Sequence, residues 1–195
     1  MQLHLYAPHG YTPGAPYWKQ LLWHFLGSPL VQSYCLPFSN LKVAVLRLFG
    51  AKIGNGVRIK PGVKVKFPWR LQVNDYVWIG ENVWIDNLAP VVLESHVCLS
   101  QQVYLCTGNH DWSDPAFQLK IAPIRIQAGS WIAARATIGP GVTVEPGAVL
   151  TLGGVAVRSL DAMTIYAGNP AQAIKQRVMY PPQHTNHSVN EVIHQ

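Results

Sequence analysis

The sequence predicts an all-β protein, a parallel β-helix of hexapeptide repeats with a helical segment in front of it. Three observations support this fold class. An aliphatic residue recurs every six positions from Ile53 to Leu150, turn-forming pairs such as Pro61-Gly62 follow the same period, and the breaks in the period come after every third repeat. A period of six with one turn per unit is typical of a β-helix in which each unit supplies one short strand and one corner. Three units complete one triangular coil, so residues 51–160 are expected to form about five coils.

The composition restricts the class of protein further. Of the 195 residues, 49% are hydrophobic and only 12% are charged, which excludes a largely disordered chain and a charged helical bundle. The net charge of +6 is spread over the chain without a dense basic run, so no nucleic-acid partner is expected. The three cysteines form no CxxC pair and no zinc-site spacing, and we interpret them as reduced thiols of a cytoplasmic protein.

Residues 1–50 are interpreted as an N-terminal apolar extension with one or two short helices. Residues 1–16 lack the basic start and the continuous apolar core of a signal peptide. Residues 17–49 are apolar, but Lys, His and Pro interrupt them before a membrane-spanning length is reached. We expect these helices to pack on the main domain. Peripheral contact of this segment with the inner face of a membrane remains the alternative.

Two positions of each hexad carry the repeat in residues 51–160. The first position is aliphatic in every unit, namely Ile53, Ile59, Val65, Val73, Ile79, Ile85, Leu93, Leu99, Leu105, Ile126, Ile132, Ile138, Val144 and Leu150. The fifth position is Val, Ala, Ser or Gly, and only Trp69 and Asn109 depart from this pattern. We expect the first side chain to point into the triangular prism and the fifth to fill the space near the corner.

The breaks in the repeat have a geometric consequence. They are Leu71-Gln72, Val91-Val92 and the fifteen residues Asp111–Arg125. Because three hexads make one coil, all three insertions are expected at the same edge of the prism. The loop 111–125 should protrude there as a packed arm, since it contains apolar residues such as Trp112 and Phe117. A long excursion from a rigid scaffold is a place where function tends to reside.

The last part of the chain lies outside the repeat. Residues 161–180 are expected to form a C-terminal segment with a short helix. Residues 181–195 are polar, and we predict that they form a disordered tail.

Five stretches of the chain carry a resemblance to a known family. They are Leu46–Gly54, Pro68–Leu71, Asp75–Gly80, Tyr104–Trp112 and Tyr166–Ala171. Together they resemble the hexapeptide-repeat acyltransferases, and within that group the colanic acid biosynthesis acetyltransferases of exopolysaccharide clusters. The resemblance implies a left-handed β-helix and a homotrimer with active sites between subunits. It also implies acetyl transfer from acetyl-CoA to a sugar hydroxyl in exopolysaccharide or cell-surface polysaccharide biosynthesis.

The implied chemistry needs a general base. A sugar hydroxyl is a poor nucleophile at neutral pH, and His is the side chain whose pKa suits the removal of its proton. Of the eight histidines, only His96 and His110 fall within the repeat, and His110 matches the family's base in the pattern Gly-Asn-His-Asp. We therefore expect direct transfer with His110 as the base and without an acyl-enzyme. Its neighbour Asp111 either orients the imidazole or simply begins the loop.

Asn87 is a second catalytic candidate. In sugar acetyltransferases of the family, an Asn one coil before the base helps to position the acceptor or the intermediate. Asn87 precedes His110 by one coil on the same face. The alternative is that Asn87 is a corner-turn residue, a common role for Asn.

The resemblance also implies a binding site for acetyl-CoA. The positions that match contacts with the pantetheine arm are Ala134, Gly154 and Trp131, and those that match phosphate contacts are Arg158 and Lys175. Arg and Lys suit phosphates, although each could instead be a solvated surface charge. No metal ion is expected in the site.

Three rival interpretations remain at this point. A zinc-dependent trimeric β-helix enzyme needs a set of histidines on the coil faces, and only His96 and His110 lie there. A non-catalytic binding or scaffold module would have no need of His110. An acyl donor other than acetyl-CoA would need only a larger pocket.

We interpret the large outward residues Trp78, Trp84, Tyr104 and Trp131 mainly as a subunit contact surface.

Overall fold

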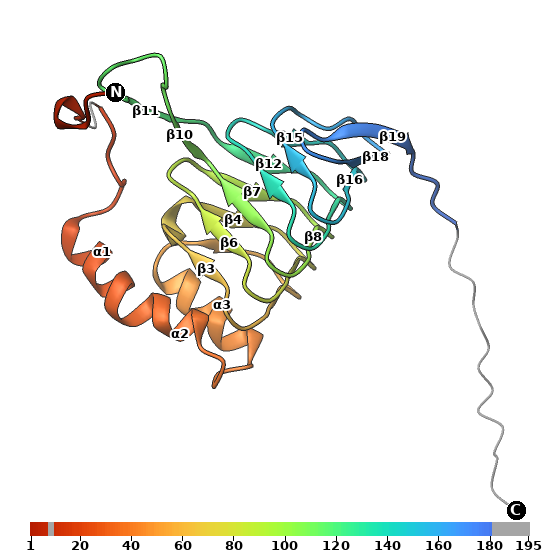
Figure 1. Cartoon of the computed structure of the whole chain (residues 1–195). Coiled ribbons are helices and arrows are strands. Elements are labelled where there is room, and N and C mark those ends of the chain that lie inside the picture. Colours follow the sequence, from red (N-terminus) through yellow and green to blue (C-terminus); the bar gives the residue numbers. More distant parts are fainter. Residues whose placement is uncertain (8–9, 181–195) are drawn as a thin grey trace, which may run out of the picture.

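The computed structural model describes residues 1–7 and 10–180, and most of these form a parallel β-helix with helices across its first coil (Figure 1). The coil strands belong to three sheets, here named A, B and C in the order in which the chain visits them, and β10 and β11 form a separate two-stranded sheet. The predicted disordered tail, residues 181–195, lies outside the described residues.

Each sheet collects one strand from every coil. Sheet A contains β1 (Lys52–Ile53), β4 (Leu71–Val73), β7 (Val91–Leu93), β12 (Ile124–Ile126) and β15 (Thr143–Val144). Sheet B contains β2 (Arg58–Ile59), β5 (Trp78–Ile79), β8 (Cys98–Leu99), β13 (Trp131–Ile132), β16 (Val149–Leu150), β18 (Thr164–Ala167) and β19 (Gln172–Gln176). Sheet C contains β3 (Lys64–Val65), β6 (Trp84–Asp86), β9 (Tyr104–Cys106), β14 (Thr137–Ile138) and β17 (Val155–Ala156). Five coils are complete, and a sixth begins with a bridge from Val144 to Leu160 and continues into β18.

The hexad pattern sets the core of the prism. All first-position residues are buried, and they stack in register from coil to coil, as in the series Ile53, Val73 and Leu93. The fifth-position Val and Ala residues are buried as well, so the prediction for both positions is confirmed. Several corners need a left-handed residue, and glycine provides it at Gly62 (φ +74°) and Gly147 (φ +68°). His96 takes the same conformation at another corner (φ 63°) and stacks on Tyr76.

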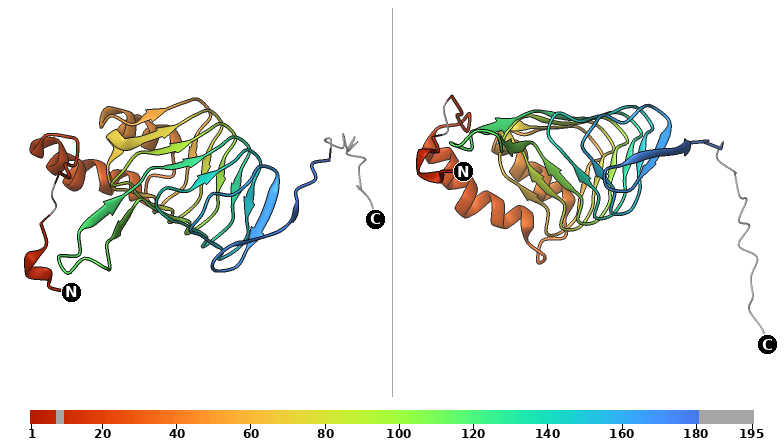
Figure 2. Two further views of the ribbon diagram at one scale, coloured as in Figure 1. Left: turned by 90° about the horizontal axis from the view of Figure 1, so that it is seen from above. Right: turned by 45° about the horizontal axis from the view of Figure 1, so that its top comes forward.

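The three insertions lie at one edge of the prism, as predicted. Each comes between a strand of sheet C and the following strand of sheet A, and the two short ones lengthen β4 and β7. The long one forms an antiparallel hairpin of β10 (Gly108–His110) and β11 (Leu119–Ile121), in which His110 is opposite Leu119. Figure 2 shows this hairpin projecting from the coils beside the N-terminal residues. We call this edge the C–A edge below.

The N-terminal extension covers the open end of the first coil. Its elements are η1 (Leu3–Leu5), α1 (Tyr17–Leu22), the π-helical turn η2 (Trp23–Gly27), α2 (Ser28–Gln32) and α3 (Ser39–Leu48). Trp23, Val31 and Leu46 of these helices are buried, and the Trp23 indole donates to the Val65 carbonyl at 3.1 Å. No helix among residues 1–7 and 10–180 is both long and apolar enough to cross a bilayer.

The expectation of a short C-terminal helix in residues 161–180 is wrong. The chain instead extends the sixth coil with β18, reverses at Gly168-Asn169-Pro170, and returns as β19 antiparallel to β18. The physical reason is the open edge of β18, whose backbone groups need partners. β19 supplies these hydrogen bonds, and a short helix would not.

Candidate active site

His110 lies at the base of the β10–β11 hairpin, where the chain leaves sheet C. Its side chain is half-buried, and it is held from three sides. The imidazole is stacked on the Phe117 ring, with the ring centroids 4.2 Å apart and the planes 5° apart. The Tyr6 ring approaches from the N-terminal segment, 5.8 Å away between centroids. The hairpin therefore fixes the plane of the His110 ring.

One hydrogen bond defines which nitrogen of His110 carries its proton. Nδ1 lies 2.8 Å from the carbonyl oxygen of Phe117. A carbonyl oxygen can only accept, so the neutral imidazole must donate from Nδ1. Nε2 then carries the free lone pair. This tautomer is the one in which Nε2 can act as a general base.

The carboxylate of Asp111 binds other partners than the imidazole of His110 in this structure. Its carboxylate pairs with the Lys120 ammonium at 2.8 Å and accepts the Ser113 N–H at 3.0 Å. The hydrogen bond from Lys120 and that from Ser113 hold the pKa of the Asp111 carboxyl below its ordinary value. Asp111 thus begins the hairpin loop and ties its two strands together, and the Phe117 carbonyl takes the position at Nδ1.

Asn87 lies at a corner of the second coil, where its side chain is bonded to the preceding coil. Its side chain is fully buried. Its carbonyl oxygen accepts the Phe67 N–H at 2.9 Å, and its amide nitrogen donates to the Phe67 carbonyl at 2.7 Å. The expectation that Asn87 reaches the acceptor does not fit this geometry, because both ends of the amide already bind the backbone of the preceding coil.

A polar cluster on sheet C was not predicted from the sequence. Asp86 pairs with the Lys66 ammonium at 2.9 Å and accepts the Tyr104 hydroxyl at 3.3 Å. Burial is the main reason why the pKa of Tyr104 is raised far above its ordinary value, and the nearby Cys106 and Asp86 raise it further. Asp86 is paired in register with Cys106, one coil before the hairpin that carries His110. The cluster therefore lies next to the same edge as the candidate base.

The N-terminal segment also reaches this edge. The Gln2 N–H donates to the Pro115 carbonyl at 2.8 Å, and the Trp69 indole donates to the Pro13 carbonyl at 2.7 Å. Arg70 donates to the Thr12 carbonyl. Residues 1–7 thus lie against the hairpin, and residues 10–16 lie against Trp69 and Arg70 of the first coil. No local sequence signal joins Tyr6 to a histidine about a hundred positions away.

Two of the predicted acetyl-CoA residues meet at one corner. Ala134 and Gly154 follow strands of successive coils between sheets B and C, and the Gly153 N–H donates to the Ala134 carbonyl at 3.0 Å. Gly154 is buried, and a Cβ there would lie 2.6 Å from Leu150 Cδ1, so packing alone requires glycine. Trp131 is on the adjacent strand β13, where its indole donates to the Ser100 hydroxyl at 2.9 Å.

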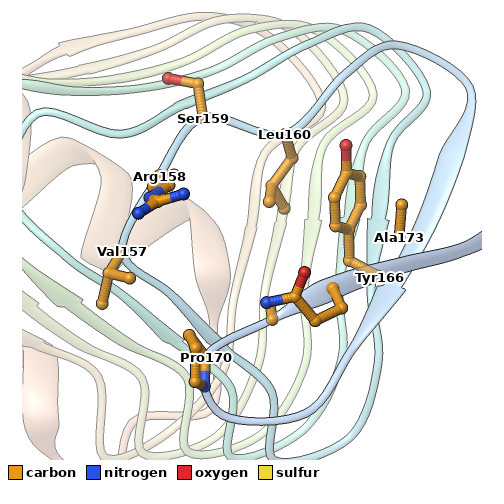
Figure 3. Close-up of a pocket in the computed structure, with 9 residues that line it drawn as sticks. Val157, Arg158, Ser159, Leu160, Tyr166, Pro170 and Ala173 are labelled. Atoms are coloured by element: carbon orange, nitrogen blue, oxygen red, sulfur yellow. The ribbon is translucent and has the colours of Figure 1, made fainter.

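Arg158 and Lys175 are separated from that corner. Arg158 lies at the C–A edge, on the side of the prism that carries His110, but at the C-terminal end of the β-helix. It lines a cavity of about 310 Å³ together with Tyr166, Pro170 and Gln172 (Figure 3). Lys175 is exposed on β19 opposite Ile165 and does not line this cavity.

The large outward aromatic residues occupy two faces. Trp78 and Trp131 are joined in register through Cys98 on sheet B. Trp84 and Tyr104 lie on sheet C and stack on each other with ring centroids 4.6 Å apart. They therefore form two separate surfaces, with two half-exposed tryptophans on sheet B and one, Trp84, on sheet C.

Comparison with known proteins places this geometry among acetyltransferases. No protein-family model matches the sequence. The chain is 37% identical over 177 residues to the protein of Escherichia coli (strain K12) named colanic acid biosynthesis acetyltransferase WcaF, covering 88% of this chain and 94% of that protein. Among solved structures, it is similar to the hexapeptide-repeat acetyltransferase VCA0836 of Vibrio cholerae O1 biovar eltor complexed with acetyl coenzyme A. That likeness has a TM-score of 0.77 and 19% identity, over 90% of this chain and 97% of the other.

A second solved structure shows the same fold. It is a maltose O-acetyltransferase of Clostridium difficile 630, with a TM-score of 0.73 and 17% identity, over 92% of this chain and 99% of that one. The predicted architecture, a left-handed parallel β-helix of hexapeptide repeats, is therefore confirmed.

Proposed function

The chain belongs to the colanic acid biosynthesis acetyltransferase family and is an acetyl-CoA-dependent acetyltransferase, and on this premise we propose that it acetylates a sugar hydroxyl in exopolysaccharide or cell-surface polysaccharide biosynthesis. The name of the WcaF relative supports the polysaccharide pathway. The maltose O-acetyltransferase among the structural neighbours supports a saccharide acceptor and a hydroxyl as the acetylated group.

The observation that carries the proposed mechanism is the hydrogen bond between His110 Nδ1 and the Phe117 carbonyl. With Nδ1 as donor, Nε2 can accept the proton of the attacking hydroxyl while the oxygen forms its bond to the thioester carbonyl carbon. His110 then returns this proton to the CoA thiolate as the carbon–sulfur bond breaks. The proton that leaves the hydroxyl thus ends on the thiol, and the transfer is direct.

We give no nucleophilic role to Cys106, the cysteine closest to His110 in the sequence. Its thiol donates to the Gly108 carbonyl at 3.1 Å, and its side chain is half-buried on β9. An acyl-enzyme would need a thiolate, and nothing cationic among its hydrogen-bond partners favours one.

We assign the acetyl-CoA site to two regions of the later coils. Trp131, Ala134 and Gly154, which lie at or beside one corner between sheets B and C, would contact the extended pantetheine arm. Arg158, beside its cavity, and Lys175 on β19 supply cations for the phosphates. In this proposal the enzyme is a cytoplasmic homotrimer, and a neighbouring subunit completes the binding site for acetyl-CoA.

The test measures CoA thiol release from acetyl-CoA with a panel of sugar acceptors, using the wild type and His110→Ala. We expect release that depends on the acceptor, and a loss of about two or more orders of magnitude in turnover for His110→Ala with acetyl-CoA binding retained. His96→Asn is the matched control, because it changes the other repeat histidine at a left-handed corner that Asn tolerates. Retained activity in His110→Ala would falsify the base assignment.

A further inference from the structure

The N-terminal helices present an apolar face that nothing in the described chain covers. α1, η2 and α2 follow one another without a break from Tyr17 to Gln32 and form one helical rod across the first coils (Figure 1). At about 1.5 Å per residue the rod is roughly 24 Å long. Its inward stripe is Trp23, Gly27 and Val31, spaced four residues apart and buried on the β-helix.

A second stripe faces outward on the same rod. It consists of Trp18, Leu21, Leu22, Phe25 and Leu26, which are all exposed, and Trp18 and Phe25 are 62% and 67% exposed. Their spacing of three and four residues places them together on the side opposite Trp23. A helix that packs by one face on a domain normally directs polar residues to solvent on the other face. This rod is therefore apolar on both sides.

The charge around the rod has one sign. Residues 1–74 contain nine Lys and Arg and no Asp or Glu, a formal charge of +9, whereas the rest of the chain carries −3. In the first coil every outward strand position holds a cation, namely Lys52 on sheet A, Arg58 on sheet B and Lys64 on sheet C. The corresponding positions of the second coil are Gln72, Trp78 and Trp84. At the outward strand positions of the third to fifth coils the one cation is Arg125, which is paired with Glu94.

Two cations of the first coil lie beside the inner side of the rod. Lys64 and Lys66 flank Val65, whose carbonyl accepts the Trp23 indole N–H of the rod. Lys66 also lines a groove of about 350 Å³ together with the rod residues Tyr17 and Leu21, although its ammonium is paired with Asp86. Lys19, on the rod itself, lies over the Trp69 ring.

We propose that this rod, with the cations of the first coil around it, is a surface that binds an anionic lipid bilayer. An interfacial helix buries apolar side chains at the level of the lipid headgroups and gains further attraction from basic residues near anionic lipids. A second copy of this chain would bring two surfaces of the same sign together, and that repulsion favours the bilayer as the occupant. The inference is independent of the acceptor and of the role of His110.

The experiment is vesicle co-sedimentation of the full chain with phosphatidylcholine vesicles that contain or lack phosphatidylglycerol. We expect the wild type to bind the anionic vesicles at least about ten-fold more tightly than the neutral ones at low salt. The variant Trp18→Ser/Phe25→Ser should lose at least about ten-fold in affinity for the anionic vesicles. Replacement of Lys60 and Lys64 by Gln should remove most of the preference for anionic lipid, since each cation near the surface contributes about five-fold.

The matched control is Met179→Ser/Tyr180→Ser. These residues are similarly exposed, 63% and 82%, but lie beyond β19 at the other end of the chain. All changed positions are exposed, and an unchanged thermal melting curve checks that each variant is folded. The proposal is overturned if the wild type does not bind anionic vesicles, or if Trp18→Ser/Phe25→Ser binds them as well as the control does. A fall in the oligomeric mass of that variant with unchanged vesicle binding would show that a second copy covers the face, and would also overturn it.

Discussion

At the scale of single residues, the candidate site depends on backbone groups more than the sequence suggests. His110 obtains its orientation from a carbonyl oxygen and an aromatic ring that both belong to Phe117. A backbone carbonyl has no residue signature, so the motif Gly-Asn-His-Asp points to the adjacent carboxylate instead. The histidine could be identified from its place in the repeat, but its hydrogen-bond partner could not.

Asn87 provides a test at this scale. Asn87→Ala removes two buried hydrogen bonds and leaves the Phe67 N–H and carbonyl unpaired, so we expect a loss of about 2–4 kcal/mol in the free energy of unfolding. Turnover per folded molecule should stay within about three-fold, because the side chain binds the backbone of the preceding coil and not the acceptor. Denaturant unfolding and steady-state kinetics on the same samples measure both effects.

The control for Asn87 is Asn55→Ala, an exposed corner asparagine that should cost less than about 0.5 kcal/mol. A large loss of turnover in Asn87→Ala without loss of stability would contradict the structural role and restore the acceptor-binding one.

Asp111 gives a second residue-scale prediction. Because its carboxylate binds Lys120 and Ser113, Asp111→Asn should lower turnover by no more than about three-fold. Lys120→Gln breaks the same ion pair from the other side and should have an equally small effect. Steady-state kinetics would contradict this reading if Asp111→Asn alone lost about four orders of magnitude, as expected for the orienting acid of a triad.

At the scale of elements, the hexad determines where prediction succeeds. A period of six with aliphatic and small positions leaves one way to fold three units into a closed coil, so the burial of Ile79 or Val97 follows directly from the pattern. The position of the insertions follows as well, because their spacing in hexads is a whole number of coils. Outside the repeat this constraint is lost.

β19 shows why the C-terminal segment was harder to predict. Residues such as Ala171, Gln172 and Lys175 have good intrinsic helix propensity, which favours the helix expected from the sequence. The open edge of β18 offers backbone hydrogen bonds that outweigh this local preference. The same holds for Tyr6, whose contact with His110 arises only because residues 1–7 lie along the hairpin.

The helix α3 carries a prediction about pH. Lys42 is buried at 1% exposure, and its ammonium donates to the Ser33 and Lys60 carbonyls. Burial lowers the pKa of Lys42 in the folded state. Between that lowered pKa and the ordinary value of about 10.4, the unfolded chain binds the extra proton, so the Lys42 contribution to stability rises with pH.

A comparison of the wild type with Lys42→Met isolates the contribution of Lys42 to the pH dependence of stability. The difference in free energy of unfolding, wild type minus variant, should become more favourable to the wild type from neutral pH toward about 10.4. Lys52→Met, at an exposed lysine, is the control for the loss of an ammonium group. Parallel stability curves for the wild type and Lys42→Met, measured by denaturant unfolding, would refute the assignment.

At the scale of the whole molecule, the outward tryptophans bear on the proposed homotrimer. Trp78 and Trp131 are 51% and 44% exposed on sheet B, next to a shallow groove that Trp78 lines with Arg58 and Ser100. A flat face with two aromatic residues is the kind of surface that an oligomer buries at its centre.

We predict that Trp78→Glu weakens trimer assembly by at least about a hundred-fold, because a carboxylate would be buried without a partner. Analytical ultracentrifugation should find three chains for the wild type and a lower mass for the variant at micromolar concentration. Trp18→Glu, on the helical rod at the other surface, is the control and should leave the mass unchanged. If Trp78→Glu sediments like the wild type, sheet B is not the assembly face.

The closure of the two ends of the β-helix has a consequence for how far the structure can grow. A stack of short parallel strands at about 4.8 Å has the same geometry as an amyloid protofilament, and an open coil would accept strands from another chain. Here α2 and α3 cover the first coil, and β19 occupies the edge of β18 with antiparallel pairing. The first coil is therefore covered by helices, and at the other end the parallel stack of sheet B stops at an antiparallel strand, so that both ends differ from the repeating coils, as the terminal repeats of solenoid proteins do. Each chain can thus concentrate in the cell as a particle of fixed length instead of seeding fibres.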